Sequence, residues 1–284
     1  MKKIIILGAQ GMLGQALVKV FSQKNYLLKA WDKDNLDIQN YPLVKSRLKK
    51  EKPDIVINAT GYTNVDGAEK EKSLALDVNG NAVGNLARVA KEIKALFIHF
   101  STDYVFGQEK KEGYTEKDVP QNPLNIYGES KLLGEQLLLK ENPCFYLIRT
   151  SWLFGPGGNN FVKTMLNLAK EKKVLRVIDD QWGKPTYAPD LAKQVEKMIE
   201  IGSDSGIYHF TNEPALTWYQ SAKTIFNIRK KIFSDSKIPE LIRIKTKDFH
   251  SLAKRPHFSV LLNTKLPLGR SVDETMENYI RKEE

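Results

Sequence analysis

A glycine-rich turn directly after a short apolar run constrains this chain more than any other feature. The run Ile4–Leu7 is followed by Gly8-Ala9-Gln10-Gly11-Met12-Leu13-Gly14, and the apolar spacing of a helix begins at Met12. Glycines allow a sharp strand-to-helix turn and let the backbone approach a pyrophosphate, which then lies on the positive end of the helix. The glycine spacing is GxxGxxG rather than GxGxxG. An ordinary turn is the alternative, but the strand before it and the helix after it favour a dinucleotide site.

Short apolar runs alternate with longer helical patterns through the first half of the chain. The runs are rich in Ile, Val and Phe without strict alternation, which indicates strands buried on both faces of a parallel sheet. Repeated strand–helix–strand units are right-handed and build a doubly wound sheet. Strands are expected at Ile4–Leu7, Leu27–Trp31, Ile55–Ala59, Leu96–Ser101 and Phe145–Arg149, and helices at Met12–Gln23, Tyr41–Glu51, Ser73–Lys94 and Tyr127–Leu139.

The pattern changes after Trp152, where Phe154–Asn160 is a loop rich in glycine. The later strands and helices suggest a smaller lobe that also sends a strand to the main sheet. We therefore predict an α/β protein with a doubly wound parallel sheet of the Rossmann type in residues 1–152. Residues 153–284 would form mainly a smaller C-terminal substrate-binding lobe, with elements around 187–212 returning to the Rossmann domain. Helices are expected at Phe161–Lys172, Asp190–Glu200, Thr217–Arg229 (Thr217 as N-cap) and Asp273–Lys282, and strands at Val174–Ile178 and Ile207–Phe210.

Composition excludes several other classes of protein. The 284 residues contain no apolar run long enough to span a membrane, so no membrane partner is expected. A single cysteine, Cys144, rules out an internal disulfide and favours the cytoplasm. The net charge of +10 comes from lysines that alternate with acidic residues, which is typical of a solvated surface, so no nucleic-acid partner is expected. The histidines share no metal-ligand spacing, and no metal is assigned.

Asp32 ends the second expected strand, eighteen residues beyond Gly14. A carboxylate at this position can accept hydrogen bonds from the hydroxyls of an adenosine ribose, which favours NADH. The neighbouring Lys33 could instead compensate a 2′-phosphate, and a solvated aspartate in a polar turn is the third reading. The sequence therefore predicts NADPH or NADH as the cofactor and does not decide between them.

Tyr127 and Lys131 lie four residues apart and so share one face of an expected helix. Such pairs arise by chance on many helices, but this one follows a dinucleotide loop, and Ser101-Thr102 ends a buried strand. Reduction of a ketone needs a proton on its oxygen, and a tyrosine can give it if a nearby ammonium lowers its pKa. Thr102 can donate a second hydrogen bond to the developing alkoxide. The pattern therefore predicts a ketoreductase site.

Several local runs, together with the glycine spacing and the Tyr-x-x-x-Lys pair, resemble the extended short-chain dehydrogenase/reductase family and, within it, the RmlD type. The resemblance extends from Met1 to about Leu268, and it is strong in the first 190 residues and thinner afterwards. The runs that carry it are Asn58–Asp66, Ser101–Phe106, Pro123–Gly128, Arg149–Trp152, Asp180–Thr186 and Arg255-Pro256.

The resemblance implies NAD(P)H-dependent reduction of the C4 ketone of dTDP-6-deoxy-L-lyxo-4-hexulose to dTDP-L-rhamnose. It makes Tyr127 the proton donor, places Lys131 on the nicotinamide ribose, and brings Thr102 to the sugar oxygen. By the same resemblance, the cofactor-binding residues are Gly8, Gln10, Gly11, Met12, Leu13, Gly14, Asp32, Ala59, Gly61, Tyr62, Tyr127 and Lys131, and the substrate-binding residues are Val65, Thr102, Asp103, Tyr104 and Trp152.

Each substrate-site residue also has a structural alternative. Val65 could be packing only, Tyr104 and Trp152 could be plain wall aromatics, and Asp103 could cap a turn through backbone N–H groups. Lys184 and Arg255 are further candidates, because a cation there could pair with the substrate diphosphate.

Three other functions stay open. Related dehydratases carry Thr-Asp-Glu where this chain has Thr102-Asp103-Tyr104, and this difference favours a reductase over a dehydratase. The first two open functions are another nucleotide-sugar ketoreductase and a nucleotide-sugar epimerase. A non-catalytic regulatory protein, similar to the regulatory subunit of methionine adenosyltransferase, would bind a dinucleotide without turnover.

Some members of the family form metal-bridged dimers through acidic residues. The early helix here reads Gly14-Gln15-Ala16, so that dimer is not expected, whereas another homodimer stays open.

Overall fold

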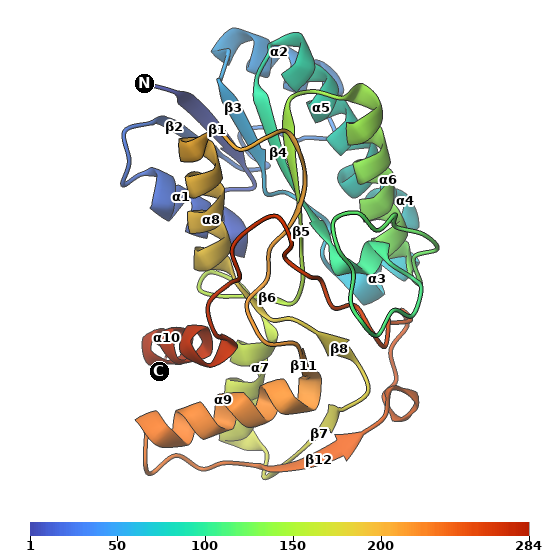
Figure 1. Cartoon of the computed structure of the whole chain (residues 1–284), viewed down its shortest axis with the longest axis vertical. Helices are drawn as coiled ribbons and strands as arrows, with labels where there is room; N and C mark the ends of the chain where they lie inside the picture. Colours follow the sequence, from blue (N-terminus) through green and yellow to red (C-terminus); the bar gives the residue numbers. More distant parts are fainter. Residues whose placement is uncertain (284) are drawn as a thin grey trace.

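A six-stranded parallel sheet forms the centre of the larger part of the molecule (Figure 1). The computed structural model describes residues 1–283. The strands lie in the order β10-β5-β4-β3-β1-β2, so the chain changes direction between β1 and β3, which is where open sheets of this kind bind ligands. The doubly wound α/β fold predicted from the sequence is confirmed. The strands are β1 (Lys3–Leu7), β2 (Leu27–Trp31), β3 (Ile55–Asn58), β4 (Leu96–Thr102), β5 (Phe145–Thr150) and β10 (Gly206–His209).

Helices cover both faces of this sheet (Figure 1). On one face, α1 (Met12–Phe21) and α8 (Ala188–Ile201) bury apolar side chains against Ile4 and Ile6 of β1. On the other face, α2 (Tyr41–Glu51) and α5 (Ala82–Glu92) pack on the sheet, and α6 (Ile126–Glu141) packs on α5. The helix-to-sheet packing places the start of α1 and of α6 at the carboxyl edge of the sheet.

The second expected strand differs from the prediction of burial on both faces. β2 is an edge strand with a single neighbour, β1, and Leu27 is 51% exposed. An edge strand has no neighbour on its outer side, so its side chains stay in contact with water.

The long helix expected over Ser73–Lys94 is also wrong in detail. The chain forms α3 (Val65–Lys70), which was not predicted, then α4 (Lys72–Leu76), a π-helical turn (Asp77–Asn81) and α5. The π-turn places buried Asn79 so that its side chain bonds both backbone groups of Tyr62, at 2.8 and 2.9 Å, and the hydroxyl of Ser130 at 3.0 Å. The interruption thus connects the loop after β3 to α6.

The second half of the chain, apart from α8 and β10, contributes most of a smaller lobe at the lower end of Figure 1. Its core joins three helices and the sheet pairs β7–β12, β6–β9 and β8–β11. Thr217 is the N-cap of α9, as the sequence predicted, and it also forms a capping box with Gln220. The elements are β6 (Leu153–Phe154), α7 (Phe161–Glu171), β7 (Val174–Ile178), β8 (Trp182–Gly183), β9 (Thr186–Tyr187), β11 (Leu216–Thr217), α9 (Trp218–Ile232), β12 (Glu240–Ile244) and α10 (Val272–Glu283).

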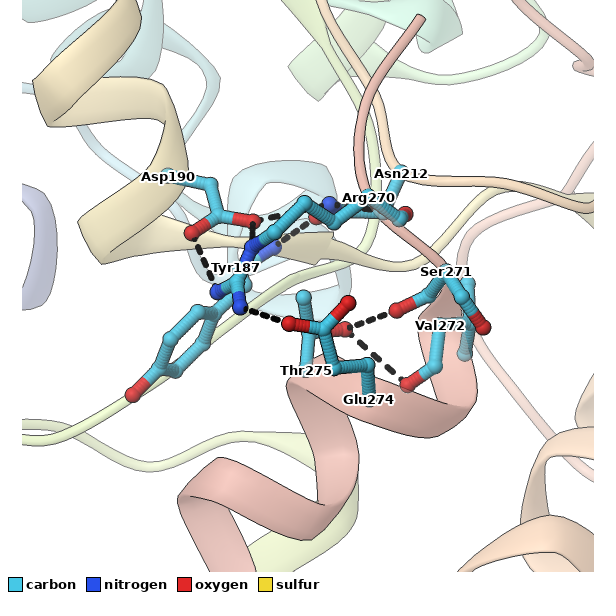
Figure 2. A network of polar contacts seen from close by, with 8 residues as sticks. All are labelled: Tyr187, Asp190, Asn212, Arg270, Ser271, Val272, Glu274 and Thr275. Carbon is cyan, nitrogen blue, oxygen red and sulfur yellow. Dashed lines mark hydrogen bonds and ion pairs between the residues drawn. The ribbon is translucent and has the colours of Figure 1, made fainter.

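A partly buried polar network joins α8 to this lobe (Figure 2). Arg270 forks onto the Asp190 carboxylate of α8 at 2.7 and 3.0 Å and also contacts Glu274 of α10. Asn212 donates to Asp190 at 3.0 Å and accepts from the backbone N–H of Tyr187 at 2.7 Å. Bidentate guanidinium–carboxylate contacts fix orientation as well as distance, so the network sets where α10 lies relative to the sheet.

Within residues 1–283, no helix is both long and apolar enough to span a bilayer.

Candidate functional site

The turn between β1 and α1 can be built only with glycine at two of its positions. Gly8 has φ +76°, and a Cβ there would lie 2.9 Å from the backbone of Ala59 and Thr60. A Cβ on Gly14 would lie 2.0 Å from the carbonyl oxygen of Gly8. Gly11 is the N-cap of α1, and no side chain caps the first turn. The first N–H groups of α1 are therefore open to an anion.

The Asp32 carboxylate fixes the glycine turn to the end of β2. It accepts hydrogen bonds from the backbone N–H groups of Gln10 and Lys33, both at 2.8 Å. Beside it lies a cavity of about 360 Å³ whose walls include Gly8, Asp32 and Lys33. Asp32 thus both supports the turn and faces a space large enough for part of a nucleotide.

A second cavity, of about 640 Å³, continues from the first, because both are lined by Gly11, Ala59, Thr60, Gly61 and Tyr62. It brings together residues from the ends of β3, β4 and β5 and from the starts of α1 and α6. The predicted residues on its walls are Gly11, Met12, Leu13, Ala59, Gly61, Tyr62, Val65, Thr102, Asp103, Tyr104, Tyr127, Lys131 and Trp152.

Two of the residues predicted to bind the cofactor line neither cavity. The backbone N–H of Gln10 donates a hydrogen bond to Asp32, and Gly14 packs against the backbone of Gly8. Their part in the site is to shape the turn. The cavity also contains residues that were not predicted, including Ser101, Thr150, Trp218 and the segment 157–159.

Thr102 and Asp103 stand at the carboxyl end of β4. The Thr102 hydroxyl accepts a hydrogen bond from the backbone N–H of Tyr104 at 3.2 Å and donates to Oδ1 of Asp103 at 3.0 Å. Thr102 is the N-cap of this turn, and the Asp103 carboxyl also has backbone hydrogen bonds there, with the N–H groups of Asp103 and Tyr104. Asp103 is 2% exposed, and burial raises the pKa of its carboxyl to about 7.

Tyr127 and Lys131 lie on the first two turns of α6, which begins where Asn125 caps the backbone N–H of Gly128 at 2.8 Å. Burial raises the pKa of Tyr127 to about 12, although hydrogen bonding with Thr102 acts in the opposite direction. Burial lowers the pKa of Lys131 to about 8, and its Nζ donates to the carbonyl of Phe100 at 2.6 Å.

The expectation that Lys131 lowers the pKa of Tyr127 is wrong for this structure. The ammonium is bonded to a backbone carbonyl, and removal of the phenol from water is the larger effect. Tyr127 is consequently a neutral phenol at physiological pH, which is the form that can donate a proton.

Trp152 has a left-handed backbone, with φ +46°. Its ring stacks on Trp218 and would lie 2.5 Å from a Cβ on Gly183, so this glycine leaves the space for it. The indole N–H of Trp218 donates to the side chain of Gln181 at 3.1 Å. Trp218 comes from the smaller lobe, and no motif in the sequence connects it with Trp152.

Lys184 and Arg255 do not fit the expectation that they pair with a substrate diphosphate. Lys184 contacts Glu213 at 2.5 Å, Arg255 contacts Asp66 at 2.7 Å, and neither residue lines either cavity. Both cations already have a carboxylate partner.

The residues present fit a dinucleotide. The glycine turn provides the close approach that a pyrophosphate needs, and the two connected cavities continue from it to Tyr127. Two buried hydroxyls on the walls of the second cavity, those of Ser101 and Thr150, have no hydrogen-bond partner among the described residues. Within residues 1–283, no group of three or more His, Cys, Asp or Glu side chains could hold a metal ion.

Comparison with known proteins gives one consistent family. The model of the RmlD substrate binding domain matches residues 1–276. A protein of Aggregatibacter actinomycetemcomitans named dTDP-4-dehydrorhamnose reductase is 43% identical, over 94% of this chain and 92% of its own length. The protein of the same name from Escherichia coli K12 is 36% identical, over 91% of this chain and 88% of its own length.

Solved structures agree with these relatives. The dTDP-4-dehydrorhamnose reductase of Bacillus anthracis, in complex with NADP, has a TM-score of 0.92 at 35% identity and covers 99% of both chains. The ortholog from Clostridium acetobutylicum has a TM-score of 0.93 at 38% identity, again over 99% of both chains.

Proposed function

This chain belongs to the RmlD substrate binding domain family, and from that membership we propose that it reduces the C4 ketone of dTDP-6-deoxy-L-lyxo-4-hexulose to dTDP-L-rhamnose with NADPH or NADH. The observation that carries the proposal is the position of a neutral, half-buried Tyr127 in the same cavity as Thr102 and Lys131, continuous with the glycine turn. The protein is accordingly an NAD(P)-dependent oxidoreductase.

The cofactor, when bound, supplies the hydride that reduces the carbonyl carbon. Tyr127 holds the proton that the ketone oxygen needs, and the high pKa of its phenol keeps that proton in place until negative charge develops. The Thr102 hydroxyl provides a second hydrogen bond to the same oxygen.

Lys131 acts as a positioning residue next to the cofactor ribose. Its ammonium is anchored to the Phe100 carbonyl at the end of β4, so the strand that presents Thr102 also fixes the lysine. Because its pKa is lowered to about 8, Lys131 loses its positive charge within the pH range in which activity can be measured.

We assign the cofactor and substrate contacts by the same reasoning. The adenosine half would lie in the first cavity beside Asp32, and Lys33 on the same wall leaves NADPH and NADH both acceptable. Val65, Asp103, Tyr104 and Trp152 on the walls of the second cavity would contact the nucleotide sugar. A homodimer, the absence of a nucleic-acid partner and a cytoplasmic location stay predictions.

Product analysis tests the proposal. The purified chain is incubated with NADPH and the 4-keto sugar generated in situ, and the product is identified by chromatography and proton NMR. The expected product is dTDP-L-rhamnose, with none formed when the pyridine nucleotide is left out. A C4 epimer would indicate another nucleotide-sugar ketoreductase. NADPH binding without any product would favour a regulatory protein.

A further inference from the structure

A long connection near the end of the chain supports three walls of the second cavity from outside. Residues 249–271, here called the strap, lead from the turn after β12 to α10 and contain no helix and only isolated β-bridges (Figure 1). Connections of more than about 12–15 residues without secondary structure are uncommon in compact domains and are usually functional. No residue of the strap lines either cavity, so the chemistry described above gives it no part.

The first wall that the strap supports is α3, whose first residue Val65 lines the cavity. Asp66 accepts hydrogen bonds from the backbone N–H of Ala253 at 2.9 Å and from the Arg255 guanidinium at 2.7 and 3.3 Å. Ala253 is buried, so its N–H depends on this carboxylate for a partner. The ion pair that occupies Arg255 therefore anchors the strap to α3.

The second wall is β8 of the smaller lobe. The backbone N–H of Trp182 donates to the carbonyl of His257 at 2.7 Å, and the N–H of Ser259 donates to the carbonyl of Trp182 at 3.0 Å. Gly183, the next residue of β8, lies against the ring of Trp152. The strap is thus bonded to the strand behind this wall residue.

Asn125 joins the strap to the third wall, the start of α6, two residues before Tyr127. Its Oδ1 accepts from the backbone N–H of Gly128 at 2.8 Å, and its Nδ2 donates to the carbonyl of Lys254 at 2.7 Å. These partners fix the orientation of the amide, because an N–H needs the oxygen and a carbonyl needs the nitrogen. Asn125 is buried and lines neither cavity.

The start of α6 is also bonded directly to α3. The Glu69 carboxylate of α3 accepts from the backbone N–H of Ile126 at 2.9 Å. The strap, α3 and the first turn of α6 therefore form a closed set of contacts around Asn125. Capping alone does not explain this residue, since serine or aspartate caps a helix about as well as asparagine. What asparagine adds is the amide that donates to the strap.

Resting on the proposed function, we propose that Asn125 is a positioning residue for Tyr127, which docks the strap on α6 and so fixes the phenol relative to the ketone. The strap holds Val65 and Trp152 through its other contacts, so one segment sets the positions of both walls relative to the proton donor. A proton donor must lie within hydrogen-bond reach of the oxygen that it serves, and a misplacement of about 1 Å can cost about 10²-fold in rate.

The Asn125→Ser variant tests this role. Serine keeps a cap for α6 but has no amide to donate to the Lys254 carbonyl. We expect kcat to fall by about tenfold or more, since the phenol is no longer held in place, while the Kd for NADPH stays at the wild-type value. A residue that only capped the helix would lose neither kcat nor NADPH binding in this variant.

Hydrogen exchange at the Ala253 amide measures docking of the strap without substrate. This N–H is bonded to Asp66, and it should exchange faster in Asn125→Ser than in the wild type. The matched control is Asn40→Ser, because Asn40 caps α2 in the same way, through the backbone N–H of Leu43 at 3.1 Å. This control should keep the wild-type kcat and the wild-type exchange rate.

Asp66→Asn weakens the other anchor of the strap and provides a second, independent variant. It should also lower kcat and speed exchange at Ala253. If both residues act by docking the strap, the double variant with Asn125→Ser should be about as slow as the slower single variant, because their effects are not additive. Multiplied losses of kcat would mean that the two residues act separately, which would overturn the common role of the strap.

The remaining outcomes are distinct. A wild-type kcat in Asn125→Ser would overturn the positioning role, as would exchange at Ala253 that is unchanged. A wild type that never reduces the keto sugar would instead overturn the proposed function, and exchange at Ala253 would still decide whether Asn125 docks the strap.

Discussion

The indole rings of Trp152 and Trp218 stack with their centroids 3.5 Å apart and their planes 9° from parallel. Trp152 follows β5 of the main sheet, whereas Trp218 begins α9 of the smaller lobe. The stack therefore joins the two parts of the chain at a wall of the cavity that contains Tyr127. Because Trp152 also has a strained left-handed backbone, its position depends on the ring behind it.

Replacing Trp218 by leucine should weaken substrate binding without weakening dinucleotide binding. Loss of the stack frees Trp152 to move, and we expect KM for the nucleotide sugar to rise roughly tenfold, or about 1.4 kcal/mol. Trp218→Phe keeps an aromatic face and should stay near the wild type. Steady-state kinetics measure KM, and NADPH titration measures dinucleotide binding. Near-ultraviolet circular dichroism reports whether the two rings are stacked. An unchanged KM in Trp218→Leu would show that the stack has no part in binding.

Alanine substitutions at two glycines of the β1–α1 turn should impair different properties of the protein. Gly14→Ala should lower stability, and Gly11→Ala should weaken NADPH binding. A Cβ on Gly14 lies 2.0 Å from a backbone oxygen, so Gly14→Ala should lose about 1–3 kcal/mol of unfolding free energy through overpacking. A Cβ on Gly11 lies 3.4 Å from the same oxygen, so Gly11→Ala should fold normally but bind NADPH weakly. Urea denaturation and NADPH titration of both variants distinguish them. Equal losses of unfolding free energy in Gly11→Ala and Gly14→Ala would contradict these separate roles of the two glycines.

The buried ion pair between Glu135 and Arg149 should be important for stability. Arg149 forks onto the Glu135 carboxylate at 2.7 and 3.0 Å, and the two side chains are 2% exposed or less. Glu135→Gln leaves a guanidinium buried without its counter-charge, which should cost about 3–5 kcal/mol of unfolding free energy. Glu277→Gln breaks partly exposed pairs with Arg281 and Lys231 and should cost no more than about 1 kcal/mol. Urea denaturation of the two variants tests this contrast.

The pH dependence of activity should reflect the charge on Lys131. Its pKa is lowered to about 8, so kcat/KM should fall as pH rises through about 8. Lys131→Arg keeps the charge, and its relative pH profile should stay flat in that range. Stability should change in the opposite sense, because between pH 8 and 10.5 the unfolded lysine binds more protons than the folded one. The contribution of Lys131 to unfolding free energy therefore rises with pH in this window, and a fall would contradict the assignment.

Local signals in the sequence were sufficient for the framework of the fold. The strand from Leu27 to Trp31 and the helix from Tyr41 to Glu51 have the bounds that were predicted. Periodicity and turn residues are properties of a few neighbouring positions, so they can be seen without the structure. The exposure of β2 could not be predicted, because it depends on the sheet order and not on the residues of the strand.

Contacts between distant parts of the chain could not be predicted for the same reason. Lys184 and Arg255 are cations in the sequence, but their partners Glu213 and Asp66 are determined by the folded chain. Likewise, the tyrosine–lysine spacing located the predicted catalytic helix, whereas burial decides the direction in which the pKa of Tyr127 moves. The Trp152–Trp218 stack has no signal in a single sequence.

The most direct test of the central claim is NADPH oxidation by wild type and by Tyr127→Phe with the dTDP-linked 4-keto sugar. Phenylalanine keeps the ring that packs against Tyr104 and removes only the hydroxyl that donates the proton. We predict steady oxidation by the wild type, loss of oxidation in the variant by a factor of about 10²–10⁴, and NADPH binding equal in both. Oxidation by Tyr127→Phe at the wild-type rate would contradict the account.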